Sequence, residues 1–92
     1  MNWDEKLLKT LEDCGKCQMS VEDTAIILGV TPEELKKELL NKYSDAYKKY
    51  NSGKMIAEFE VRKAIYNLAT QGSSQAQDLW LKLRDELKIH EA

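Results

Sequence analysis

Apolar residues recur along this chain at three- and four-residue steps, the spacing at which one face of an α-helix meets a core. No stretch alternates apolar and polar positions for more than a few residues, and only one proline and four glycines interrupt the 92 residues. The pattern therefore predicts an all-α fold without strands. We expect five helices, over residues 3–13, 20–28, 31–40, 44–69 and 74–88.

Capping residues mark the ends of several of these helices. Asn2 is placed to cap the first helix, and Gly15 is placed to end it. Ser20 caps the second helix, with an acidic residue three positions on, and Gly29 terminates it. Thr31-Pro32-Glu33-Glu34 opens the third helix with a threonine cap, a proline at the first helical position and two acids over the positive helix end.

Residues 20–39 have the pattern of a helix-turn-helix. Ala25 supplies the small side chain that is needed where two helices cross, and Gly29 tolerates a left-handed turn between them. Leu35 is expected to anchor the second helix. Glu38 departs from the pattern because an apolar residue is usual there, and the leucine that follows it is expected to take over this anchoring.

A helix-turn-helix of this kind would bind DNA through its second helix, whose first residues reach the base edges in the major groove. Thr31 and Glu33 occupy that position here, and Lys36 and Lys37 are placed to contact phosphates or guanine. The acidic start of this helix opposes binding to phosphates. The alternative interpretation is a helical corner that only packs against its neighbours.

The predicted helix from Ser44 onward carries apolar residues on two sides. Its first stripe runs through Ala46, Tyr50, Gly53, Ala57, Val61, either Ala64 or Ile65, and Leu68. The phase continues through residues 51–53, so we expect an unbroken helix although a central glycine costs roughly 1 kcal/mol. The second stripe holds Met55, Phe59 and Tyr66. A helix with two apolar sides needs two partners.

The last predicted helix follows the turn at residues 70–74 and carries Trp80 on its apolar face. We expect the last two helices to form a long antiparallel hairpin over residues 44–92, after a helix-turn-helix module over residues 1–43. This hairpin is predicted to bind further copies of the chain. The residues predicted for the oligomer interface are Tyr50, Met55, Phe59, Tyr66 and Trp80.

The charge is unevenly distributed along the chain, although the net charge is only −2. Residues 1–45 hold six basic and ten acidic residues, whereas residues 46–92 hold eight and six. A nucleic-acid-binding protein is usually basic, so the total counts against tight DNA binding through bulk electrostatics. One local basic patch lies between Lys36 and Lys54, where six lysines accompany two acids.

Few residues support catalysis or metal binding. Cys14 and Cys17 form a single Cys-x-x-Cys pair, and the one histidine, His90, lies far from it in the sequence, so the four ligands of a zinc site are missing. There is no serine–histidine–acid set and no glycine-rich phosphate loop, so we expect no enzyme and no cofactor. No apolar run approaches the roughly 18 residues of a membrane span, and the first residues do not form a signal peptide.

Three segments follow one another in a characteristic order: the string from Gly15 to Val30, then Ala46-Tyr47-Lys48-Lys49-Tyr50 with Gly53-Lys54, then residues 64–82 around Gly72-Ser73-Ser74. In this order the chain resembles the small terminase subunits of tailed bacteriophages and prophages. The resemblance covers residues 11–84. It depends on the succession of the segments, because no single motif among them is diagnostic.

The resemblance implies a specific role. Small terminases assemble into rings, commonly of eight to twelve subunits, through a central helical hairpin. Their helix-turn-helix modules recognise the viral packaging site on double-stranded DNA, which they deliver to the large terminase subunit with its ATPase and nuclease. By this resemblance the chain would act in the cytoplasm of a bacterial host cell. The lysines that would contact DNA are Lys36, Lys37, Lys42, Lys48 and Lys49.

Two alternatives remain open at this point. A transcriptional regulator would use the same helix-turn-helix, with the hairpin as the interface of a two-fold dimer. A helical interaction or assembly module that does not bind DNA would use the aromatic stripe as its anchor. The number of copies in solution distinguishes a ring from a dimer, and DNA binding distinguishes both from the third case.

Overall fold

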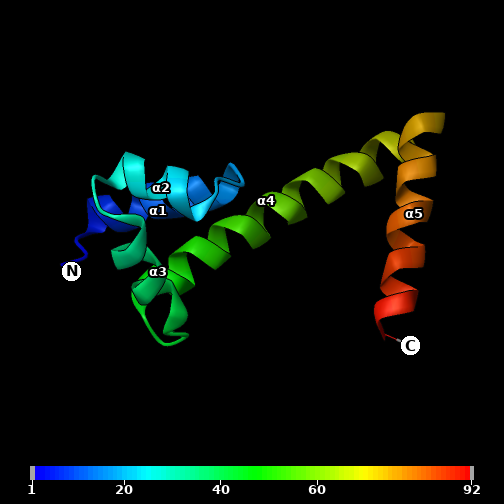
Figure 1. The fold of residues 1–92 in the computed structure, drawn as a ribbon. Helices are drawn as coiled ribbons and strands as arrows, with labels where there is room; N and C mark the ends of the chain where they lie inside the picture. Colours follow the sequence, from blue (N-terminus) through cyan, green and yellow to red (C-terminus); the bar gives the residue numbers. More distant parts are fainter. Residues whose placement is uncertain (1, 92) are drawn as a thin grey trace. The chain divides into compact units, whose positions relative to one another are not determined.

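The computed structural model describes the backbone of residues 2–91 and the side chains of residues 2–89, and this part of the chain contains only helices (Figure 1). The predicted all-α fold is therefore confirmed. The five helices are α1 (Glu5–Lys16), α2 (Val21–Leu28), α3 (Pro32–Leu40), α4 (Asp45–Thr70) and α5 (Ser74–Glu91).

The helices belong to two compact units, Met1–Ala57 and Glu58–Ala92. The N-terminal unit contains α1, α2, α3 and the first half of α4, and the C-terminal unit contains the rest of α4 and α5. The sequence predicts a different division, after residue 43, between a DNA-binding module and an oligomerisation module. That division concerns function, and it stays a prediction.

The caps of α2 and α3 are those that the sequence predicts. The Ser20 hydroxyl accepts a hydrogen bond from the Asp23 amide at 3.1 Å. Gly29 ends α2 in the left-handed conformation, at φ +76°, and the Val30 amide closes the turn by donating to the Ala25 carbonyl at 3.0 Å. Thr31 caps α3 with its hydroxyl, and Pro32 is the first helical residue. These signals are local, so the sequence alone specifies the α2–α3 turn.

The N-terminal unit has a small closed core. Its buried side chains are Leu11, Ala25, Leu35, Ala46 and Tyr50. The partly buried side chains packed around them are Trp3, Val21, Leu28, Val30 and Leu39. Leu39 thus contacts the core as expected beside the half-buried Glu38, and burial of Leu35 anchors α3.

The ends of α1 differ from the prediction. Asp4, not Asn2, caps the helix, because the Asp4 carboxylate accepts a hydrogen bond from the Leu7 amide at 2.8 Å. Gly15 does not end the helix, which continues to Lys16 and then turns at Gln18, a left-handed residue with φ +57°. A glycine near a helix end has more than one use, and here it serves packing instead of termination.

Gly15 lies where α1 and α4 cross, opposite Gly53. A Cβ atom added to Gly15 would come closer than 3.0 Å to the Tyr50 carbonyl oxygen, and one added to Gly53 would do the same to the Glu12 carbonyl oxygen. Both obstacles are backbone atoms, which cannot rotate away as a flexible side chain can. The two helices therefore approach so closely that neither position has room for a side chain.

Helix α4 passes through Asn51-Ser52-Gly53 without a break, as its apolar phase predicts. Ser44 stabilises its start, since the Ser44 hydroxyl accepts a hydrogen bond from the Tyr47 amide at 3.1 Å and donates one to the Glu38 carbonyl at 2.9 Å. The crossing with α1 explains why a glycine is present in the middle of a long helix.

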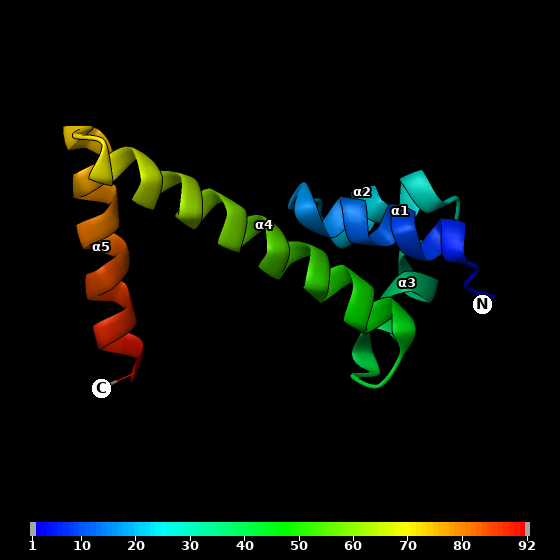
Figure 2. The same cartoon turned by 180° about the vertical axis from the view of Figure 1, so that it is seen from behind.

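The C-terminal unit has almost no core. Among its described side chains only Ala76 is buried, and the other apolar side chains of this unit are exposed or half-buried. The two helices open away from the turn at residues 71–73 (Figures 1 and 2). A closely packed antiparallel hairpin is therefore not confirmed, and the apolar faces of this unit have few partners within their own chain.

Candidate DNA interface and assembly surface

Two of the five lysines predicted to contact DNA already have acidic partners. The Lys36 ammonium lies 3.3 Å from a carboxylate oxygen of Glu22, which links α3 to α2. The Lys49 ammonium lies 3.7 Å from a carboxylate oxygen of Glu12, beside the crossing of α1 and α4. Glu12 is largely buried and also accepts Lys9 and Lys16. The Lys49 pair is therefore part of the packing between these helices.

The other three predicted lysines form no ion pair among the described residues. Lys37 lies in the last turn of α3, Lys42 in the connection to α4, and Lys48 in the first turn of α4. All three are exposed. We call Lys37, Lys42 and Lys48 the basic segment. Its three cations lie in the stretch of chain from the last turn of α3 to the first turn of α4, and no ion pair holds them among the described residues.

The N-terminal end of α3 has the opposite charge. Glu33 and Glu34 are both exposed in its first turn, where they stabilise the positive end of the helix. The Thr31 hydroxyl accepts a hydrogen bond from the Glu34 amide at 3.2 Å, so its oxygen serves the helix cap. The exposed acidic side chains of α3 therefore gather at its N-terminal end, whereas the basic segment begins in its last turn.

The Glu22 carboxyl group is held in its charged form. Hydrogen bonding to its own backbone amide lowers the pKa of Glu22, and the ammonium of Lys36 lowers it further. The stabilising contribution of this charge is present above the ordinary glutamate pKa and is lost as the pH falls through the lowered pKa. At neutral pH, Glu22 therefore competes with any phosphate for Lys36.

Four of the five residues predicted for the oligomer interface are exposed, namely Met55, Phe59, Tyr66 and Trp80. Phe59 is the most exposed of them, at 65%. Tyr50 corrects the prediction, because it is only 5% exposed and belongs to the core of the N-terminal unit. Its hydroxyl donates a hydrogen bond to the Met19 carbonyl at 2.5 Å, and its ring lies under the Lys54 ammonium. Tyr50 is therefore used within its own chain.

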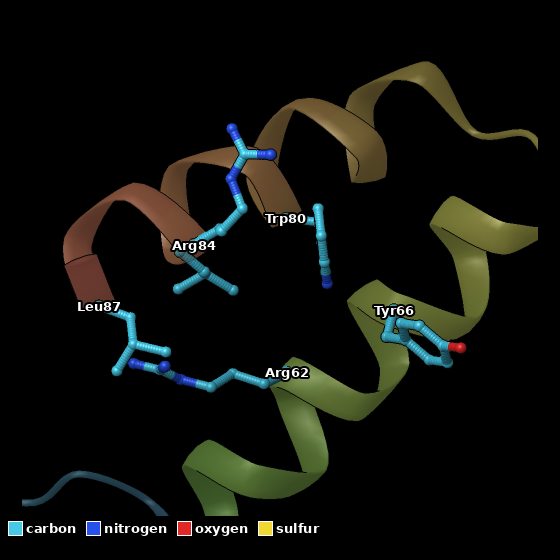
Figure 3. Close-up of a pocket in the computed structure, with 6 residues that line it drawn as sticks. Arg62, Tyr66, Trp80, Arg84 and Leu87 are labelled. Atoms are coloured by element: carbon cyan, nitrogen blue, oxygen red, sulfur yellow. The ribbon is translucent and has the colours of Figure 1, made fainter.

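Two of the exposed aromatic residues of the C-terminal unit, Tyr66 and Trp80, border an open cavity of about 240 Å³ between α4 and α5 (Figure 3). Its lining residues are Arg62, Tyr66, Trp80, Leu83, Arg84 and Leu87. Arg62 extends from α4 toward Leu87 of α5, and the Arg84 guanidinium lies 5.8 Å from the centre of the Trp80 ring. We call this cavity the hairpin groove. It offers an apolar floor with two cations at its border.

The sequence pattern predicts Tyr66 and Trp80, which line this groove, as interface residues, but it does not predict the two arginines beside them. The available signal is spacing, because Arg62 precedes Tyr66 by four positions and Arg84 follows Trp80 by four, which places each pair on one helix face. On each helix alone, either arginine looks like an ordinary solvent-exposed charge.

The two cysteines are free thiols in different environments. Cys14 is buried in α1 and Cys17 is exposed at its end. Burial raises the pKa of the Cys14 thiol, which therefore stays protonated at neutral pH. Among the described residues, no group of three or more histidine, cysteine, aspartate and glutamate side chains is arranged to hold a metal ion.

The described helices include none that is long and apolar enough to cross a membrane. Comparison with known proteins found no matching family model, no matching curated protein and no matching solved structure. The assignment of function therefore depends on the residues and the geometry described above.

Proposed function

We propose that this chain is a non-enzymatic DNA-binding assembly subunit, similar in role to a small terminase. Several copies join through their C-terminal units into a ring. Each copy presents a basic segment to double-stranded DNA, and the assembly delivers that DNA to a large terminase subunit in the bacterial cytoplasm. The motif order of the sequence supports the terminase-like role.

The observation that carries the proposal is the difference between the two units. The N-terminal unit closes a core of its own, whereas the C-terminal unit leaves Phe59, Tyr66 and Trp80 exposed and, of its side chains up to residue 89, buries only Ala76. Two helical segments without a shared core are marginal in water, because helical stability in proteins comes mainly from packing of the apolar face. Neighbouring copies would supply the missing contacts to the C-terminal unit.

The hairpin groove supports assembly in a second way. An apolar side chain from a neighbouring copy fits its floor, and carboxylates beside that side chain would meet Arg62 and Arg84. Aromatic residues and arginines are the side chains that contribute most to the stability of protein interfaces. Both kinds are present here within one small surface.

The basic segment supports DNA binding by the assembly. Three lysines per copy are too few for tight binding by one chain, since non-specific DNA affinity grows with the number of phosphates neutralised. In a ring, copies of the segment act on the same duplex, and the effective concentration set by the ring multiplies weak individual contacts. This resolves the conflict between a net charge of −2 and a role on DNA.

Equilibrium binding of the full chain to a labelled duplex, measured across a range of salt concentrations, tests the proposal. The triple variant with alanine at Lys37, Lys42 and Lys48 is expected to bind more weakly. In a single bound copy the slope of log affinity against log salt should fall by about 0.9 for each lysine lost.

A matched control removes three lysines of the C-terminal unit instead, namely Lys63, Lys82 and Lys88. This control should keep the affinity and the salt slope of the unmodified chain. Equal losses in both triple variants would show that charge in general, not the basic segment, attracts the duplex. No binding by the unmodified chain at low salt would refute the DNA-binding role.

A further inference from the structure

The connection between α3 and α4 is short, contains no glycine or proline, and is held by its own hydrogen bonds. The Asn41 side-chain oxygen accepts from the Tyr43 amide at 3.0 Å, and the Asn41 carbonyl accepts from the Ser44 amide at 3.0 Å. The Ser44 hydroxyl then donates to the Glu38 carbonyl at 2.9 Å. The loop therefore has a fixed shape.

Two apolar side chains extend into solvent here, one from Leu40, the last residue of α3, and one from Tyr43 in the loop. Leu40 is 83% exposed and Tyr43 is 87% exposed, the largest values for large apolar residues in the described part of the chain. The loop lies at the edge of the N-terminal unit, on the side of α3 away from α2 (Figures 1 and 2). Nothing in the core of this unit requires either side chain, because α3 is already anchored by Leu35.

The charges around the loop are mainly positive. Lys42 lies between the two apolar residues, and Lys37 and Lys48 lie one turn away on either side in sequence. Two acids are close in sequence: Glu38 is half-buried, and Asp45 is exposed at the N-terminal end of α4. The loop thus combines an apolar tip with cations, and no ion pair neutralises these lysines among the described residues.

The charge around this apolar tip indicates which kind of partner fits it. Proteins that bind the minor groove insert apolar side chains between base steps while cations hold the flanking phosphates. The exposed Lys37, Lys42 and Lys48 place cations of this kind around the two apolar side chains. The ring and hydroxyl of tyrosine suit a surface that is apolar at the bases and polar at the backbone.

We propose that Tyr43, with Leu40 beside it, is an apolar wedge that enters the minor groove of double-stranded DNA while Lys42 and its neighbours contact the phosphates. This inference rests on the proposed DNA-binding function and adds a site to it. The wedge contributes affinity that does not depend on salt, and it bends the duplex.

The test uses the full chain and a duplex with a donor and an acceptor dye at its two ends. Tyr43→Ala is expected to weaken binding roughly tenfold, as loss of a base-stacking aromatic does, with an unchanged salt slope. It should also remove the energy-transfer increase that reports a kink of about 20–90°. Tyr43→Phe is the matched control and should keep both properties.

Lys42→Ala provides the opposite signature, since it should lower the salt slope by about 0.9. Because Tyr43 is on the surface, the alanine variant should fold, which its thermal melting curve verifies. If the unmodified chain binds DNA but Tyr43→Ala binds and bends the duplex equally well, the wedge is refuted and the DNA-binding role stands.

Two other outcomes also overturn the wedge. No binding of any duplex by the unmodified chain removes the proposed function and the wedge together. A lower native mass for Tyr43→Ala, without a change in DNA affinity per assembled copy, would assign the loop to contacts between copies instead.

Discussion

At the scale of single residues, the N-terminal unit depends on two glycines that permit one helix to cross another. Gly15 and Gly53 face each other at the crossing of α1 and α4, where backbone atoms of the opposite helix occupy the space of a side chain. The cost of a glycine within each helix is about 1 kcal/mol of helix propensity. Close packing of the two helices offsets it.

The substitution Gly53→Ala separates these two effects because they have opposite signs. Helix propensity alone would stabilise the variant by about 1 kcal/mol. Overpacking against the Glu12 carbonyl is expected to dominate and to lower the free energy of unfolding by about 1–3 kcal/mol. Urea unfolding measures the difference.

Ser52→Ala is the control for this substitution, since Ser52 is exposed in the same helix turn. The control should be neutral or slightly stabilising, because alanine has the higher helix propensity. If Gly53→Ala is also stabilising, the crossing is looser than described and the glycine has no packing role.

At the scale of elements, α3 has two ends with different chemistry. Its N-terminal end is acidic and capped, and its C-terminal end carries the basic segment and the fixed loop. One lysine between these ends, Lys36, is held by Glu22 of α2. In the proposed function, the orientation of DNA on this helix would depend on which of these charges remain available.

Glu22→Gln should release Lys36 for phosphate contact. The expected result is a several-fold higher DNA affinity and a salt slope increased by about 0.9, because one more lysine neutralises a phosphate. Glu5→Gln removes the same charge from α1 and should change the salt slope little. Equal effects of both substitutions would attribute the gain to net charge alone, and no effect of either would exclude Lys36 from the interface.

Sequence predicts the elements of this chain well where the cause is local. The caps at Ser20, Gly29 and Thr31 depend on neighbouring residues, so the α2–α3 turn follows from them. The phase of apolar residues likewise predicts the unbroken α4. Gly15 is predicted from the sequence to end the first helix, and its packing role depends instead on the path of α4, which a local signal does not contain.

Candidate site residues are harder to predict because their availability depends on tertiary partners. Lys36, Lys37 and Lys49 all belong to the same lysine-rich stretch of the sequence. Lys36 and Lys49, however, each form an ion pair with a carboxylate from another helix. Tyr50 and Phe59 are both aromatic residues on apolar stripes of α4, but Tyr50 lies in the core whereas Phe59 is exposed. The tertiary contacts of each side chain decide whether it is available for binding, and the sequence pattern does not show these contacts.

At the scale of the whole molecule, the proposed assembly depends on the exposed apolar faces of the C-terminal unit. Phe59→Asp places a charge in the proposed interface and should lower the native mass, since an unpaired charge is costly to bury. Asn67→Asp adds the same charge to an exposed polar position of α4 and should keep the assembly. Equal masses for both variants would remove Phe59 from the interface.

The central claim is that these faces are covered by further copies of the chain, and the native mass of the unmodified protein in solution tests it most directly. If the chain forms a ring, we expect a closed assembly of more than two copies that persists on dilution. A two-fold dimer would favour a transcriptional regulator with the same DNA-binding segment. A monomer at all concentrations would contradict assembly through the C-terminal unit.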